Sequence, residues 1–171
     1  MKALILDYGG VIALRKPGEF IPIFPDFESW DKATRGEVPE DLLWNRVEEH
    51  TGKTKEELLN ILFRERELNQ PVFDFLKRNK HKFKLGIINN GLYSMLGKAI
   101  EEWRLDELFD VIINSAREKI SKPNPKIFRL ICKRLNIKPQ DCVFIDDKQK
   151  HVNAAVSLGM KGFVYTDFFS F

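Results

Sequence analysis

Polar side chains follow several of the apolar runs in this 171-residue sequence. The first is Asp7, which ends the run Ala3–Leu6 and precedes two glycines. An unpaired carboxylate is costly among apolar side chains, so we expect Asp7 where a buried strand emerges. One such end is typical of a turn or helix cap, but several at one edge of a parallel sheet predict a ligand site. Four later apolar runs also end in polar residues, at Asn89-Asn90-Gly91, Asn114-Ser115, Asp146-Asp147 and Thr166-Asp167.

The carboxylates of Asp7, Asp146 and Asp147 would repel one another at such an edge unless a cation joined them. Magnesium prefers oxygen ligands, and it usually takes one or two carboxylates together with a substrate phosphate. We therefore expect Mg²⁺ as the cofactor of this site.

Lys122 precedes a predicted helix and is placed to bring a positive charge to the same edge. A solvated loop lysine is the alternative interpretation of this residue. Together with amide donors from Asn89 and Asn90, a lysine and a metal suit a phosphoryl group. In this interpretation Asp7 is the nucleophile and forms an aspartyl-phosphate intermediate.

Strands and helices alternate along the second part of the chain. This alternation predicts an α/β fold, a Rossmann-like three-layer core with a parallel sheet and right-handed crossovers. The roughly seventy residues between the first two strands exceed a direct crossover, so they must carry structure of their own. After the first strand we expect further strands at 84–89, 110–114, 142–146 and 162–165.

The inserted segment, residues 16–68, has the pattern of a small helical cap. Pro39 is expected at the first position of one helix, and Gly52 is typical of the end of that helix. Thr54 and Glu57 form a capping-box pattern for the next helix. The core then comprises residues 1–15 and 69–171.

Composition excludes several classes of protein. With 43% hydrophobic residues the chain can bury a core, and a net charge of +3 does not favour nucleic acid as a partner. The basic cluster Lys77–Lys84 is either a solvated helix end or a patch for a polyanion. Cys132 and Cys142 are expected to be small buried hydrophobic residues. No stretch is long enough for a signal peptide or a membrane span, so we expect a cytoplasmic protein with no membrane partner.

Four motifs of the sequence, taken in order, resemble those of the haloacid dehalogenase (HAD) superfamily. The resemblance covers essentially the whole chain and is to the subgroup with a helical cap inserted after the first strand. The matching segments are Asp7-Tyr8-Gly9-Gly10-Val11, Ile87-Ile88-Asn89-Asn90-Gly91, Lys122-Pro123-Asn124-Pro125 and Val143-Phe144-Ile145-Asp146-Asp147.

The resemblance implies roles for these residues. Asp7 would be the nucleophile and a metal ligand, and the main-chain carbonyl of Gly9 would be a second ligand. Asp147 aligns with the metal-binding aspartate, while Asp146 would act through water or through a neighbouring ligand. Lys122 would neutralise Asp7 and the phosphate. The substrate-binding residues implied are Asn89, Asn90, Gly91 and Lys122.

Three residues depart from the family pattern. Most phosphatases of the family have an aspartate, serving as general acid and base, where this chain has Gly9; such catalysis contributes about 10²–10⁴-fold. Asn89 replaces a serine or threonine, although its amide still donates hydrogen bonds. His151 stands where an asparagine or aspartate is usual, and it either replaces the missing acid or caps the following helix.

The resemblance therefore implies a magnesium-dependent phosphatase of a small phosphorylated metabolite, of which a sugar phosphate is one example. The alternatives are a metal-independent dehalogenase and a non-catalytic binding protein of the same fold. Three cap residues, Trp30, Trp44 and Arg46, either line the substrate or form the core of the cap. The sequence leaves open the oligomeric state and the role of the aromatic tail Phe168–Phe171.

Overall fold

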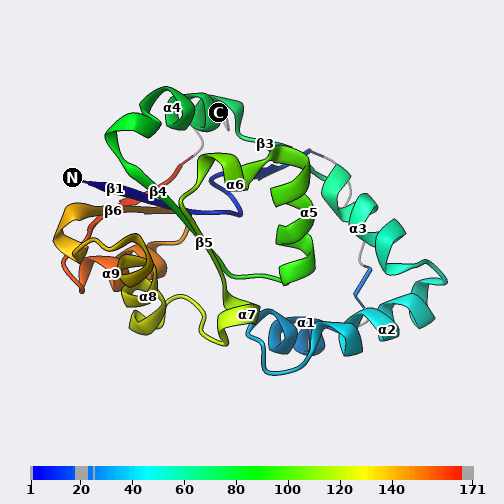
Figure 1. Ribbon diagram of the computed structural model, residues 1–171. Coiled ribbons are helices and arrows are strands. Elements are labelled where there is room, and N and C mark those ends of the chain that lie inside the picture. Colours follow the sequence, from blue (N-terminus) through cyan, green and yellow to red (C-terminus); the bar gives the residue numbers. More distant parts are fainter. Residues whose placement is uncertain (1, 18–22, 25, 167–171) are drawn as a thin grey trace.

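A five-stranded parallel sheet forms the centre of the computed structural model (Figure 1). The structure describes residues 2–17, 23–24 and 26–166. The strand order is β5-β4-β1-β6-β7, and each neighbouring pair is parallel. The strands are β1 (Ala3–Asp7), β4 (Lys84–Asn89), β5 (Val111–Asn114), β6 (Cys142–Asp146) and β7 (Lys161–Val164). The predicted α/β fold is confirmed, and the predicted strands match to within a residue.

Helices cover both faces of this sheet. Those of the core are α4 (Gln70–Asn79), α5 (Tyr93–Trp103), α6 (Leu105–Leu108), α7 (Ser115–Glu118), α8 (Pro125–Leu135) and α9 (Gln149–Val156). Short 3₁₀ turns lie at Lys80–Lys82 and Pro139–Asp141. No helix in the described ranges is long and apolar enough to cross a membrane.

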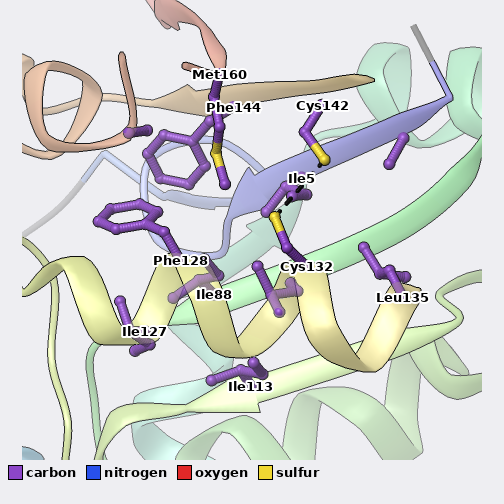
Figure 2. Packing of buried hydrophobic residues seen from close by; sticks show 13 residues of the cluster. Ile5, Ile88, Ile113, Ile127, Phe128, Cys132, Leu135, Cys142, Phe144 and Met160 are labelled. Atoms are coloured by element: carbon purple, nitrogen blue, oxygen red, sulfur yellow. Dashed lines mark hydrogen bonds between the residues drawn. The ribbon is translucent and has the colours of Figure 1, made fainter. Parts of the chain in front are cut away.

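The side chains of β1 alternate between two apolar layers. Ala3 and Ile5 pack with residues of α8 and α9, and Leu4 and Leu6 pack with residues of α4, α5 and α6. Figure 2 shows the first layer, in which residues of α8 reach the sheet. Gly86 permits this approach, because a Cβ there would lie 2.7 Å from a side-chain carbon of Ile131. The central strands β1 and β4 are therefore buried on both faces, whereas β7 at one edge of the sheet is largely exposed.

Three helices form the cap: α1 (Phe27–Thr34), α2 (Glu40–Thr51) and α3 (Lys55–Arg64). Gly52 ends α2 with a φ of 67°, and Thr54 and Glu57 form the capping box of α3, as predicted. Pro39 differs from its prediction by one residue, because it precedes the first helical residue of α2. The cap helices share an apolar cluster with Leu92 of the core, in which Trp44 is 1% exposed.

A two-stranded antiparallel sheet was not predicted from the sequence. It pairs β2 (Ala13–Arg15) with β3 (Arg66–Leu68). The pairing brings together the two ends of the inserted segment, so the chain enters and leaves the cap at one place. The aromatic tail and Asp167 lie outside the described residues, as does most of the segment before α1.

Candidate active site

Polar residues at the ends of four adjacent strands meet at one edge of the sheet. Asp7 ends β1, Asn89 ends β4, Asn114 ends β5 and Asp146 ends β6. All four are buried, with at most 6% exposure. The central place of β1, between β4 and β6, puts Asp7 at the point where the strand order reverses, which is where open α/β sheets bind ligands.

Lys122 lies between two carboxylates at this edge. Its Nζ is 2.7 Å from Oδ1 of Asp7 and 2.7 Å from Oδ2 of Asp146. The lysine side chain is fully buried, so the interpretation of Lys122 as a solvated loop residue is wrong. A buried ammonium needs such partners, and here it cancels much of the repulsion between the two aspartates.

Asn90 positions Lys122 through its main chain. The Asn90 side chain donates to the Lys122 carbonyl and accepts from the Lys122 amide, both at 2.9 Å. Both polar ends of the Asn90 side chain are therefore engaged with the protein. The contact between Asn90 and substrate that the sequence predicts would therefore come from the main-chain amide of Asn90.

The two carboxylates that pair with Lys122, those of Asp7 and Asp146, differ in how readily they ionise. Burial raises the pKa of Asp7 to about 6, although Lys122 opposes the shift. Burial also opposes ionisation of Asp146, but hydrogen bonds from His151, Lys122 and the Lys148 amide outweigh it and hold the pKa of Asp146 well below its usual value. Asp146 is thus held as an anion that pairs with the lysine. Burial disfavours the ionised form of Asp7, and such an environment is typical of a reactive carboxylate.

The two oxygens of Asp7 have different surroundings. Oδ1 accepts from the Tyr8 amide at 2.6 Å and pairs with Lys122. Oδ2 accepts no hydrogen bond from the residues that the structure describes. One oxygen of the predicted nucleophile is therefore held in place while the other is left for a ligand.

His151 is buried on α9 and faces Asp146. Its Nδ1 lies 2.9 Å from Oδ1 of Asp146, and the residue is 4% exposed. His151 therefore contacts the same carboxylate that pairs with Lys122.

Two sets of donor atoms are candidates for a metal site. Asp7, Asp146 and His151 have ligand atoms within 4.8 Å of one another, but the Lys122 ammonium already lies between the two carboxylates of this set. The second set is the one that the resemblance implies: the Asp7 carboxylate, the Gly9 carbonyl and the exposed Asp147. Burial, and then the nearby charge of Asp146, raise the pKa of Asp147. Carboxylate and carbonyl oxygens are the donors that magnesium prefers, so the chemistry of the second set fits the expected ion.

The glycines after Asp7 differ in the space around them. A Cβ on Gly10 would lie 2.8 Å from Oδ2 of Asp147, and Gly10 has a φ of +80°. The close approach of Asp147 to this turn therefore requires a glycine. A Cβ on Gly9 would meet nothing within 4 Å, so the absence of a side chain there is not imposed by packing.

A cavity of about 110 Å³ lies between this edge and the cap. The side chain of Asn89 lines it and makes no hydrogen bond within the described part of the chain. Arg66 also lines the cavity, and no described carboxylate pairs with it. The apolar lining comes from α1, α3 and α5, with Trp30, Leu59, Leu62, Phe63, Leu92, Met95 and Leu96.

The three cap residues for which the sequence left two interpretations lie in different places. Trp30 lines the cavity. Trp44 belongs to the core of the cap and donates from its indole nitrogen to Ser94 Oγ at 3.1 Å. Arg46 donates to Ser29 Oγ at 3.0 Å within the cap.

Two contacts that fasten the cap to the core were missed by sequence reasoning. Glu40 of α2 accepts the main-chain amides of Tyr93 and Ser94, which begin α5. Ser115 donates to the Thr34 carbonyl at 2.5 Å and accepts from the amide of Gly91 at 3.1 Å. The segment between β4 and α5 is thus bonded to Ser115 on one side and to Glu40 on the other.

A family model described as haloacid dehalogenase-like hydrolase matches residues 1–159. The chain is 31% identical over 87 residues to a glyceraldehyde 3-phosphate phosphatase of Pyrococcus furiosus, covering 50% of this chain and 36% of that protein. It is 26% identical over 181 residues to a phosphorylated carbohydrates phosphatase of Thermotoga maritima, covering 94% and 83%. In the first curated relatives that it matches, the chain spans only 5%, 36% and 34% of their lengths.

Among solved structures, the fold is similar to a HAD family enzyme of Bacteroides thetaiotaomicron in complex with magnesium and inorganic phosphate. The TM-score is 0.82 with 19% sequence identity, and the match covers 99% of this chain and 98% of that one. At this identity the likeness concerns the fold.

Proposed function

The chain belongs to the haloacid dehalogenase-like hydrolases, and on this premise we propose that it is a magnesium-dependent phosphatase of a small phosphorylated metabolite. The observation that carries the proposal is the asymmetric environment of Asp7. One oxygen is fixed by Lys122 and the Tyr8 amide, and the other is free of protein donors among the described residues. The phosphatase relatives support the same reaction.

The free oxygen of Asp7 attacks the phosphorus atom, and the bond from phosphorus to the leaving oxygen breaks. The leaving oxygen takes up a proton from solvent, because residue 9 has no acid to supply one. Water then attacks the phosphorus of the aspartyl-phosphate, which releases inorganic phosphate and regenerates Asp7. The Lys122 ammonium offsets the negative charge on the phosphoryl oxygens.

Magnesium held by Asp7, Asp147 and the Gly9 carbonyl would supply further neutralisation of the phosphoryl charge. Asp146 and His151 keep the ammonium of Lys122 in place. Asn89 is positioned in the cavity wall, where its amide donates to a phosphoryl oxygen.

The cavity supports a short leaving group. Its volume of about 110 Å³ and its largely apolar lining favour a small, weakly polar group over a polyhydroxylated sugar. A three-carbon phosphate, as in the name of the Pyrococcus relative, has a suitable size.

The test is hydrolysis of p-nitrophenyl phosphate and of glyceraldehyde 3-phosphate with added magnesium. Asp7→Asn should abolish turnover of both, and the exposed Asp106→Asn is the matched control that retains it. EDTA should remove the activity and added magnesium should restore it. Halide release from a 2-haloacid that persists in EDTA would favour the dehalogenase instead. Absence of both activities would favour the non-catalytic protein.

A further inference from the structure

Two thiols meet in the apolar layer between the sheet and α8. Cys132 lies on α8 and Cys142 begins β6, and Figure 2 shows the two sulfur atoms facing each other. The Sγ atoms are 3.8 Å apart, and the residues are 5% and 1% exposed. The expectation that both cysteines are small buried residues is correct. Their contact also brings two thiols together, which is the arrangement that thiol–disulfide chemistry needs.

Cys132 also borders a hollow in the molecular surface, with a volume of about 460 Å³. Its lining is Lys2, Cys132, Lys133, Asn136, Ile137, Lys138 and Asp141. Three lysines face a single aspartate, and that aspartate pairs with Lys2 at 3.3 Å. The hollow therefore has a net positive charge and favours an anionic reagent.

The two thiols differ in reactivity. The contact with Cys142 lowers the pKa of Cys132, and the same contact, followed by burial, raises the pKa of Cys142. Cys142 also lies 3.4 Å from the Lys138 carbonyl, to which its thiol donates. Cys132 borders the hollow and is therefore the thiol that a reagent reaches first, and a lowered pKa favours its reactive thiolate form.

We propose that Cys132 and Cys142 form a redox site that closes to an intramolecular disulfide by exchange with an anionic low-molecular-weight disulfide. The Cys132 thiolate attacks one sulfur of the reagent, whose sulfur–sulfur bond breaks and releases one thiol. Deprotonated Cys142 then attacks Cys132 Sγ, which breaks the mixed disulfide and releases the second thiol. The protein loses two protons and two electrons, and the reagent disulfide is reduced to two thiols.

The bond would tie α8 to the start of β6 without reaching the active site. A disulfide is about 2.05 Å long, so the sulfur atoms must approach by roughly 1.8 Å from their separation of 3.8 Å. Asp146 is four residues further along β6, about 13 Å away at about 3.3 Å per residue. We therefore expect oxidation to raise the melting temperature by about 5 °C or more and to leave catalysis unchanged.

The test treats the native protein with glutathione disulfide and, in parallel, with dithiothreitol. The expected result is an intact mass lower by two hydrogen atoms, no thiol that can be alkylated after denaturation, and a higher melting temperature, all reversed by dithiothreitol. Two thiols that persist after treatment, a mixed disulfide that does not resolve, or a covalent dimer would each overturn the proposal.

Variants assign the order of attack. Cys142→Ala should stop at a glutathione adduct on Cys132, whereas Cys132→Ala should remain unmodified because Cys142 is 1% exposed. The reverse pattern would overturn the assignment of Cys132 as the attacking thiol. If a variant fails to fold, the mass and the thiol count of the unaltered protein still decide whether the disulfide forms.

Discussion

The two glycines after Asp7 look alike in the sequence but have different surroundings in the fold. A Cβ at Gly9 would meet nothing within 4 Å, so packing does not exclude a side chain at this position. Because an aspartate at this position would supply general acid and base catalysis, we expect Gly9→Asp to raise kcat by about 10²-fold or more. The measurement is steady-state hydrolysis of an alkyl phosphate, whose poor leaving group needs the proton.

Gly9→Asn is the matched control for this gain, because it has the same shape and cannot transfer a proton. An equal gain in both variants would show that the effect comes from the backbone. Gly10→Ala, by contrast, should damage the site, since its Cβ would collide with Asp147.

Asp7 should lower the stability of the metal-free fold. Its folded pKa of about 6 lies above the ordinary value of 3.8 for an aspartate, so its ionisation destabilises the folded state. The cost is absent below the unfolded pKa, grows as the pH rises through about 6, and is complete above that value. At roughly 1.4 kcal/mol per pKa unit, it amounts to at most about 3 kcal/mol.

Asp7→Asn should therefore melt at a higher temperature than the unaltered protein in EDTA at pH 8, and the difference should shrink toward pH 4. Thermal denaturation at both pH values measures it. Lys122 keeps Asp146 as a partner in the variant, so the ion pair is not wholly lost. A difference that is independent of pH would contradict the raised pKa of Asp7.

Residue types at the strand ends could be predicted from the sequence, but their individual contacts could not. The edge residues Asp7 and Asp146 follow from apolar runs that end in carboxylates. The use of Asn90 to hold the Lys122 main chain depends on two residues 32 positions apart, and no local pattern reports it. The same limit applies to Cys132 and Cys142, whose contact depends on how α8 packs on the sheet.

Elements with local signals were predictable, and elements made by distant pairing were not. The capping box of α3 lies within four residues, and the structure confirms it. The strands β2 and β3 have three residues each, which is too short for an alternation to stand out, and they pair across the whole cap. The start of α5 has no side-chain cap of its own, because Glu40 of α2 supplies it.

Glu40 should therefore contribute to the stability of α5 as well as of α2. A carboxylate at a helix N-terminus satisfies free amides and interacts favourably with the helix dipole. We expect Glu40→Gln to cost about 1 kcal/mol in the free energy of unfolding, measured with urea. Asp41→Asn, whose side chain is 84% exposed one position further on, is the control and should be nearly neutral. Equal losses in the two variants would contradict a cap at α5.

At the scale of the whole molecule, cap and core are joined by side chains as well as by the chain. Glu40 and Trp44 reach α5, and Ser115 reaches the Thr34 carbonyl. We therefore expect a single cooperative thermal transition, with equal calorimetric and van't Hoff enthalpies. Two transitions in scanning calorimetry would show that the cap unfolds separately.

The hydrogen bonds that Glu40 accepts at the start of α5 also affect whether the inserted cap can be exchanged between proteins. A segment inserted between two strands could in principle be replaced by the corresponding segment of another protein. Here the insert completes a helix of its host, and the host in turn supplies Ser94 as the partner of the Trp44 indole. A transplanted cap without a carboxylate at the position of Glu40 would leave the first turn of α5 with open amides, so the unit of exchange is the cap together with the start of that helix.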